Sequence, residues 1–148
     1  MRPTLRPATE DDLAVLQPIA YHDFHHGRFL EDPTIPVEHA RKRSFYWVAD
    51  LLQQGHLQAA ESRGKIIGFH AERLDMEKRH ADLILTGTCA AYAMLALPLW
   101  TTALSNLSER GIQHCSTLIS TANTGVINLY ARLGFHFDTA LLGFRKYL

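Results

Sequence analysis

Two residues on one predicted strand carry side chains suited to proton transfer. Residues 65–73 alternate as a β-strand does, and this alternation puts His70 and Glu72 on the same face. An imidazole or a carboxylate in such a position can remove a proton from an ammonium group, directly or through a water molecule. Both residues equally suit the solvent-facing side of a strand, so the pattern makes them candidate bases without assigning the role.

The phenol of Tyr130 is a candidate proton donor. Apolar and aromatic residues recur at helical spacing near the C-terminal end, namely Val126, Leu129, Tyr130 and Leu133. Asn123 precedes this stripe as a helix cap, and Gly134 follows it as a C-terminal cap. Taken alone, Tyr130 also fits the amphipathic core face of this helix.

Three histidines, His22, His25 and His26, lie close together in a polar stretch between two predicted helices. A structural zinc site needs four converging ligands, and no cysteine pair or spaced carboxylate accompanies these imidazoles. We therefore expect no metal. The imidazoles are also candidates for contact with a substrate, although exposed histidines are the commoner explanation.

These residues belong to a regular order of predicted elements. Strands are predicted at 4–6, 56–61, 65–73, 82–88 and 114–120, with further strand-like residues at 135–148. Helices are predicted from Thr9, over 36–55, from Pro98 to the stop at Gly111, and from Asn123 to Gly134. This order specifies one α/β (α+β) domain over residues 1–148, built around a single, mostly antiparallel sheet.

The composition is that of an ordinary globular protein. The 148 residues are 47% hydrophobic and 20% charged, and Cys89 and Cys115 are the two cysteines. Because no hydrophobic leader follows Met1 and no disulfide framework is indicated, we expect a reducing, cytoplasmic location.

Charge and hydropathy argue against two classes of partner. Fifteen basic and fifteen acidic residues give a formal net charge of zero, which does not favour a nucleic acid as partner. The longest apolar run, residues 90–100, falls well short of the ~20 residues that a membrane-spanning helix needs. We expect neither nucleic acid nor membrane binding.

Residues 123–135 also form a sequence motif. They read Asn-Thr-Gly-Val-Ile-Asn-Leu-Tyr-Ala-Arg-Leu-Gly-Phe. This closely resembles the fourth-helix signature of the GNAT N-acetyltransferases, with an Asn, a branched apolar residue, a Tyr and a closing Gly-Phe at matching spacing. The predicted order of elements matches that family over essentially the whole chain. The resemblance implies a GNAT-like fold, with four helices around a sheet of six to seven strands and a splay between the fourth and fifth strands.

The resemblance also implies a reaction. GNAT enzymes transfer an acetyl group from acetyl-CoA to a primary amine by direct attack. The residue that matches Tyr130 is the general acid for the leaving thiolate, and the one that matches Asn123 helps to hold the pantetheine. Because the pantetheine pairs with the splayed strands, the thioester carbonyl is expected to accept a backbone N–H near Leu85, Thr86 and Gly87, as in an oxyanion hole.

One stretch departs from the family pattern. The family's pyrophosphate loop, an Arg or Gln followed by two glycines, falls here on residues 91–96, and only Ala96 matches it. The backbone N–H groups of Met94, Leu95 and Ala96 and the dipole of the next helix remain as phosphate ligands. The loop therefore either still binds coenzyme A, serves another acyl donor, or belongs to a non-catalytic GNAT-fold module with a ligand-binding or regulatory task.

A less specific resemblance concerns the acceptor. Residues 27–48 contain Arg-Phe, Asp-Pro and Tyr-Trp pairs, similar to the early region of the dTDP-fucosamine and exopolysaccharide amino-sugar acetyltransferases. This resemblance implies a small-molecule amine acceptor, an amino-sugar nucleotide, whose diphosphate needs cations. Arg28 is the candidate ligand, and it is equally interpreted as a solvated side chain or a partner of Asp32. The acceptor and the oligomeric state stay open, and a homodimer is compatible with the sequence.

Overall fold

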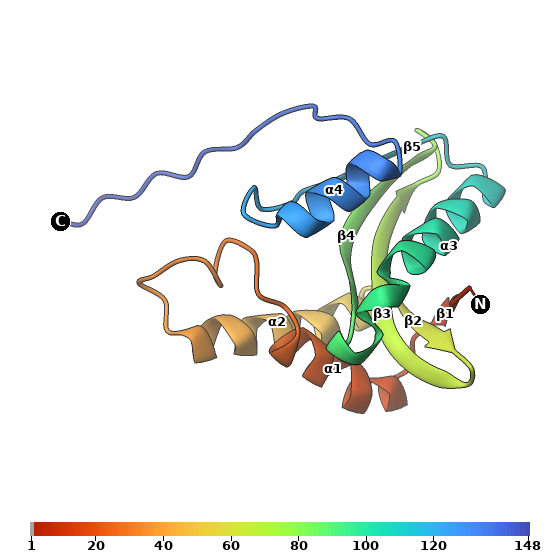
Figure 1. The fold of residues 1–148 in the computed structure, drawn as a ribbon, viewed down its shortest axis with the longest axis horizontal. Coiled ribbons are helices and arrows are strands. Elements are labelled where there is room, and N and C mark those ends of the chain that lie inside the picture. Colours follow the sequence, from red (N-terminus) through yellow and green to blue (C-terminus); the bar gives the residue numbers. More distant parts are fainter. Residues whose placement is uncertain (1) are drawn as a thin grey trace.

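Five strands form one sheet in the order β1-β2-β3-β4-β5. The computed structural model describes residues 2–148 and bounds the strands as β1 Thr4–Pro7, β2 Leu57–Ser62, β3 Lys65–Asp75, β4 His80–Thr88 and β5 His114–Thr117. The pairings β1–β2, β2–β3 and β3–β4 are antiparallel, and β4–β5 is parallel. A parallel pair needs a crossover connection, which α3 supplies. The predicted α/β order and mostly antiparallel sheet are confirmed (Figure 1).

Helices cover both faces of the sheet. α1 (Leu13–His22) and α2 (Val37–Gln53) pack on one face, and α3 (Ala96–Glu109) and α4 (Thr124–Arg132) pack on the other (Figure 1). Short 3-10 turns, η1 (Glu10–Asp12) and η2 (Ala90–Leu95), lead into α1 and α3. The four predicted helices are thus present in the predicted order.

Each face of the sheet has its own apolar core. The core under α1 and α2 includes the buried residues Leu16, Ile19, Val48, Leu51, Phe69 and Ala71. The core on the opposite face consists of Ala81, Leu83, Trp100, Leu107 and Ile112, against which Leu129, Tyr130, Leu133 and Phe135 pack. Because α3 and α4 share this second core with β4, the Tyr130 side chain is held against the sheet.

β4 and β5 separate part of the way along their length. Their pairing runs from His80 opposite His114 to Leu83 opposite Thr117, whereas β4 continues to Thr88. Within residues 2–148, positions 84–88 therefore have β3 on one edge and no strand on the other. This confirms the predicted splay between the fourth and fifth strands, and it leaves one backbone edge of β4 open to a ligand.

The sheet is smaller than predicted. We expected six to seven strands, including strands within residues 135–148, but the structure has five strands and that segment forms none. Its apolar side chains are largely exposed, Phe137 by 83% and Phe144 by 92%. Strand propensity mainly reflects packing against neighbouring strands and a core. Strand-like composition was therefore not sufficient to form a strand here, because residues 136–148 pack against neither a neighbouring strand nor a core.

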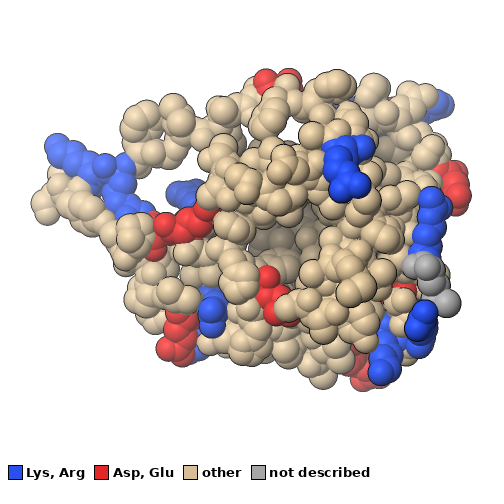
Figure 2. All heavy atoms as spheres, viewed as in Figure 1, with Lys and Arg blue, Asp and Glu red and all other residues tan. Residues whose placement is uncertain are grey.

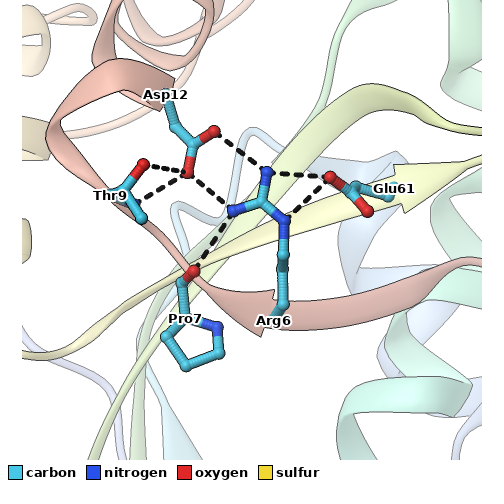
Figure 3. Close-up of polar contacts among 5 residues, drawn as sticks. All are labelled: Arg6, Pro7, Thr9, Asp12 and Glu61. Atoms are coloured by element: carbon cyan, nitrogen blue, oxygen red, sulfur yellow. Dashed lines mark hydrogen bonds and ion pairs between the residues drawn. The ribbon is translucent and has the colours of Figure 1, made fainter.

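A charged network joins β1 to β2 and to the helical layer. Arg6 donates to the two carboxylate oxygens of Asp12 at 2.7 and 2.9 Å and to Glu61 at 2.8 Å (Figure 3). Asp12 also accepts the backbone N–H of Thr9 at 2.7 Å, which closes a capping box at η1. The hydrogen bonds from Arg6, aided by those from Thr9, hold the pKa of Asp12 below its usual range despite burial.

Asp12→Asn is expected to lower the free energy of unfolding by about 1–2 kcal/mol at neutral pH, because charge-assisted hydrogen bonds are lost. A lowered folded-state pKa stabilises the protein above the unfolded-state value of about 4, and that contribution fades as the pH falls. In urea unfolding, the difference between the variant and the wild type should therefore be constant above about pH 5 and should shrink progressively as the pH falls below about 4. Asp11→Asn, at the exposed neighbouring position, is the control. A difference that stays constant with pH would contradict this assignment.

Candidate functional site

β4, β5 and α4 meet where the two strands part. At this point the Thr117 hydroxyl donates to the Leu83 carbonyl at 3.1 Å, across the last paired rung. Tyr130 approaches from α4, and its hydroxyl lies beside that of Thr117. The structure thus brings Tyr130 to the closed end of the splay.

Aromatic packing holds the Tyr130 ring in place. The ring lies edge-on to Trp100 of α3 with centroids 5.2 Å apart, and it packs on Phe135 with centroids 5.1 Å apart. Burial raises the pKa of Tyr130, and the neighbouring Thr117 hydroxyl offsets only part of that effect. The phenol is therefore protonated at neutral pH, as a general acid must be.

The caps of α4 aim Tyr130 at the strands. The Asn123 side chain accepts the Val126 N–H at 3.3 Å and satisfies a backbone group at the helix start. At the other end Gly134 has φ 86°, a value that favours glycine, and the Phe135 N–H donates to the Tyr130 carbonyl at 3.0 Å. The motif residues thus shape a short, capped helix, and the contact of Asn123 with a pantetheine stays a prediction.

A hollow opens in the surface beside these residues. Figure 2 shows this hollow, and Figure 1, drawn from the same side, gives its place between α4, β4 and the layer of α1 and α2. Most atoms around it are uncharged, although an acidic side chain lies at its lower rim and a basic one lies above it (Figure 2). A largely uncharged groove beside an open strand edge suits an extended ligand that pairs with the backbone.

The connection between α1 and α2 covers the far end of β4. A Cβ added at Gly87 would collide with the Phe24 ring, so glycine is required there by close approach. Phe24 also packs against Phe69 of β3, with ring centroids 5.5 Å apart. The predicted ligand-binding positions Leu85, Thr86 and Gly87 lie together next to this connection, on the part of β4 that pairs with β3 but extends beyond its pairing with β5.

The predicted phosphate loop directly follows β4, and one of its predicted donors is already used. Residues 91–96 form most of η2 and the first position of α3, and the Met94 side chain is 81% exposed. The Ala96 N–H already donates to the Ala93 carbonyl, and Pro98 has no N–H. Of the predicted ligands Met94, Leu95 and Ala96, the last therefore has its backbone donor occupied.

Arg28 lies near other cations and does not pair with Asp32. Its guanidinium lies 5.6 Å from the centre of the Phe29 ring, and that of Arg43 lies 4.1 Å from the same ring. Asp32 instead accepts a hydrogen bond from Arg145 of the tail at 2.8 Å. Arg145 was missed because 113 positions separate it from Asp32, and no local pattern reports such a contact.

His70 and Glu72 share a face, as predicted, but they are buried, with 0% and 5% exposure. His70 Nε2 lies 2.9 Å from Glu72 Oε2, and His70 Nδ1 lies 2.7 Å from Thr86 Oγ1. Gln58 of β2 and Arg110 at the end of α3 both donate to Glu72. In this arrangement neither predicted base is exposed to a substrate.

Glu72 borders a second cavity, which we call the rear cleft. This cleft has a volume of about 660 Å³ and is lined by Pro7, Gln54, Gly55, His56, Leu57, Gln58, Glu72, Leu74, Asn106, Glu109 and Arg110. Burial raises the pKa of Glu72, but hydrogen bonds from His70 and Arg110 outweigh it, so the pKa lies below its usual range. Glu72 is therefore a carboxylate at neutral pH.

Residues 2–148 contain no group of three or more His, Cys, Asp and Glu side chains arranged to hold a metal ion. His22 ends α1, and His25 and His26 follow it in the connection to α2. Over the same part of the chain, every helix is too short or too polar to cross a membrane.

The fold recurs in solved structures. The protein YycN from Bacillus subtilis matches with a TM-score of 0.70 at 19% identity, over 99% of both chains. A transcriptional regulator from Bacillus halodurans C-125 matches with a TM-score of 0.64 at 19% identity, over 97% of this chain and 99% of that one. The PaiA N-acetyltransferase from Thermoplasma acidophilum, solved in complex with coenzyme A, matches with a TM-score of 0.63 at 17% identity, over 93% and 92%.

No family model and no curated protein matches the sequence. The structural matches include a protein of the GNAT family from Chromobacterium violaceum ATCC 12472. At such low identity they establish the fold alone. The chain has the fold of the GNAT acetyltransferases, as its motif predicted.

Proposed function

We propose that this protein is an N-acetyltransferase that moves the acetyl group of acetyl-CoA directly to a primary amine. The observation that carries the proposal is the position of the half-buried Tyr130, whose hydroxyl lies beside that of Thr117 at the point where β4 and β5 separate. The signature at residues 123–135 and the fold shared with PaiA, which was solved with coenzyme A, support the same reaction.

In this proposal the open edge of β4 binds the pantetheine arm as an added strand. A backbone N–H near Leu85, Thr86 or Gly87 donates to the thioester carbonyl and stabilises the oxyanion that forms when the amine attacks. The C–S bond then breaks, and Tyr130 gives its proton to the departing thiolate. A neutral phenol next to this sulfur prevents the release of a free thiolate.

The acceptor is proposed to bind beside the α1–α2 connection. Arg28 and Arg43 both lie against Phe29, which offers two guanidinium groups around an aromatic ring. Such a surface suits a diphosphate and supports an amino-sugar nucleotide as the acceptor. Acetyl transfer to an amino-sugar nucleotide, compared with transfer to the free amino sugar, a peptide and a polyamine, tests this choice.

Coenzyme A is expected to stabilise the protein against heat, by about 2.7 kcal/mol when it is present at 100 times its dissociation constant. Because residues 91–96 contain no glycine and the Ala96 N–H is already used, we expect much of this binding to come from the pantetheine arm. Adenosine 3′,5′-bisphosphate, which lacks the arm, is therefore the control and should stabilise the protein far less. Thermal unfolding followed by circular dichroism measures both. Equal stabilisation by the two ligands would refute the role of the arm, and no effect of coenzyme A would refute the enzyme.

A non-catalytic ligand-binding or regulatory module is the second candidate. Two observations favour it: the divergent loop at residues 91–96 and the fold shared with a transcriptional regulator. Stabilisation by coenzyme A without acetyl transfer to any acceptor would support this alternative over the enzyme.

A further inference from the structure

A line of hydrogen-bonding groups crosses the domain from β4 to the rear cleft. Thr86 Oγ1 contacts His70 Nδ1 at 2.7 Å, and His70 Nε2 contacts Glu72 Oε2 at 2.9 Å. Glu72 borders the rear cleft together with Arg110. Thr86 lies beyond the last rung that β4 shares with β5. The line therefore connects the open part of β4 with a second opening in the protein.

The partners of His70 decide which of its nitrogens carries a proton. Since Glu72 is a carboxylate and can only accept, Nε2 carries hydrogen and donates to it. In the neutral imidazole Nδ1 then has a lone pair, which accepts the hydroxyl proton of Thr86. A hydroxyl, an imidazole and a carboxylate in this order are the groups of hydrolase triads, in which the imidazole takes the proton of the hydroxyl.

The other groups around His70 are compatible with this proton order. Trp100 of α3 packs edge-on to the imidazole with centroids 5.9 Å apart, and Tyr130 of α4 packs on that same indole. Arg110 of α3 and Gln58 of β2 contact Glu72 and not the imidazole. The remaining titratable groups of the rear cleft are His56 and Glu109. Glu72 is thus the one charged group that contacts His70 directly.

We propose that Thr86 receives a proton from the attacking amine and that His70 and Glu72 relay it toward the rear cleft. This inference rests on the proposed function. As the C–N bond forms, the nitrogen loses a proton to Thr86 Oγ1, and the Thr86 hydroxyl proton moves to His70 Nδ1. The Nε2 proton then passes through Glu72 to water in the rear cleft. Tyr130 separately protonates the sulfur as the C–S bond breaks, so the relay and the acid act on different atoms.

Because they are buried, His70 and Glu72 act on the substrate only indirectly in this proposal. His70 has no exposed surface, so it acts through Thr86 and is a positioning and relay residue. Thr86 is the group that would touch the substrate. The hydrogen bond between His70 and Glu72 also contributes to the packing of β3, so the test must separate proton transfer from structural support.

Thr86→Val is the primary test, because it removes the hydroxyl and keeps the shape of the side chain. We expect kcat to fall about 10²–10⁴-fold, the usual contribution of general base catalysis, while stabilisation by coenzyme A is unchanged. Thr86→Ser, which keeps a hydroxyl at this position, should restore activity. Thr88→Val is the matched control, since Thr88 lies two positions along the same strand and pairs with Gly68.

A second measurement does not depend on turnover. Nitrogen-15 NMR of the imidazole should show His70 protonated at Nε2 and unprotonated at Nδ1 at neutral pH. A protonated Nδ1, or wild-type turnover by Thr86→Val, would overturn the relay and leave the acetyltransferase intact. Absence of transfer by the wild type to every acceptor tested would overturn the proposed function, and the relay with it.

Discussion

A Tyr130→Phe protein should bind acetyl-CoA as the wild type does and turn it over about 10²–10⁴-fold more slowly, which is the usual contribution of a general acid. The change removes only a hydroxyl, so the packing of the ring on Trp100 and Phe135 is retained. A fall in kcat without a change in Kd identifies an interaction made in the transition state. Steady-state kinetics and titration with coenzyme A measure the two quantities.

Two comparisons sharpen this test. Tyr147→Phe removes a hydroxyl that contacts Arg145 on the tail, at 3.1 Å, and should leave turnover unchanged. Because burial raises the pKa of Tyr130, the protonated acid persists above the usual tyrosine value of about 10, and activity lost at higher pH should reflect its ionisation. That basic limb should be missing from the Tyr130→Phe profile. Equal turnover in the variant and the wild type would exclude Tyr130 as the acid.

Trp100→Ala should cause the largest loss of stability among the site variants, about 3–5 kcal/mol, because truncating a buried tryptophan leaves a cavity. The indole is 5% exposed and contacts the rings of Tyr130, His70 and Phe135. Its removal frees the Tyr130 ring from one of its two aromatic neighbours. Urea unfolding measures the loss of stability. Turnover, measured under conditions where the variant is folded, shows the effect of releasing the Tyr130 ring from its position.

Leu16→Ala is the matched control for this variant. Leu16 is fully buried in the core under α1 and α2, on the face of the sheet away from Tyr130. Its truncation should destabilise the protein by about 2–5 kcal/mol, a similar amount, with little effect on the turnover of the folded protein. If both variants lost turnover equally, general destabilisation would explain the Trp100 result.

The sequence predicts α4 well because every signal for it is local. The cap at Asn123, the apolar stripe that includes Tyr130 and the stop at Gly134 all lie within one short segment, and the structure uses each of them. The splay follows from the resemblance to a known fold. A local pattern is enough where the interactions that decide it connect residues a few positions apart.

The burial of side chains and the contacts between distant residues could not be predicted from local sequence patterns. Alternation correctly puts His70 and Glu72 on one face of β3, but it does not show that α3 covers that face. Arg110 approaches Glu72 from 38 positions away and Gln58 from 14, so tertiary packing assembles this cluster. The Tyr130 motif, in contrast, is local and could be identified by its resemblance to the GNAT signature. The prediction of strands within residues 135–148 was wrong because local strand propensity is not sufficient where no neighbouring strand is available for pairing.

The position of β1 has a consequence for biosynthesis. Arg6 is translated before its partner Glu61, which lies 55 positions later, beyond α1 and α2. While the ribosome is still extending the chain, the first strand has no neighbour, and the apolar faces of both helices have no sheet to cover. Closing such a long segment carries an entropic cost that must be met before the contacts form. We therefore expect the nascent chain to remain a substrate for chaperones until β2 and β3 have emerged.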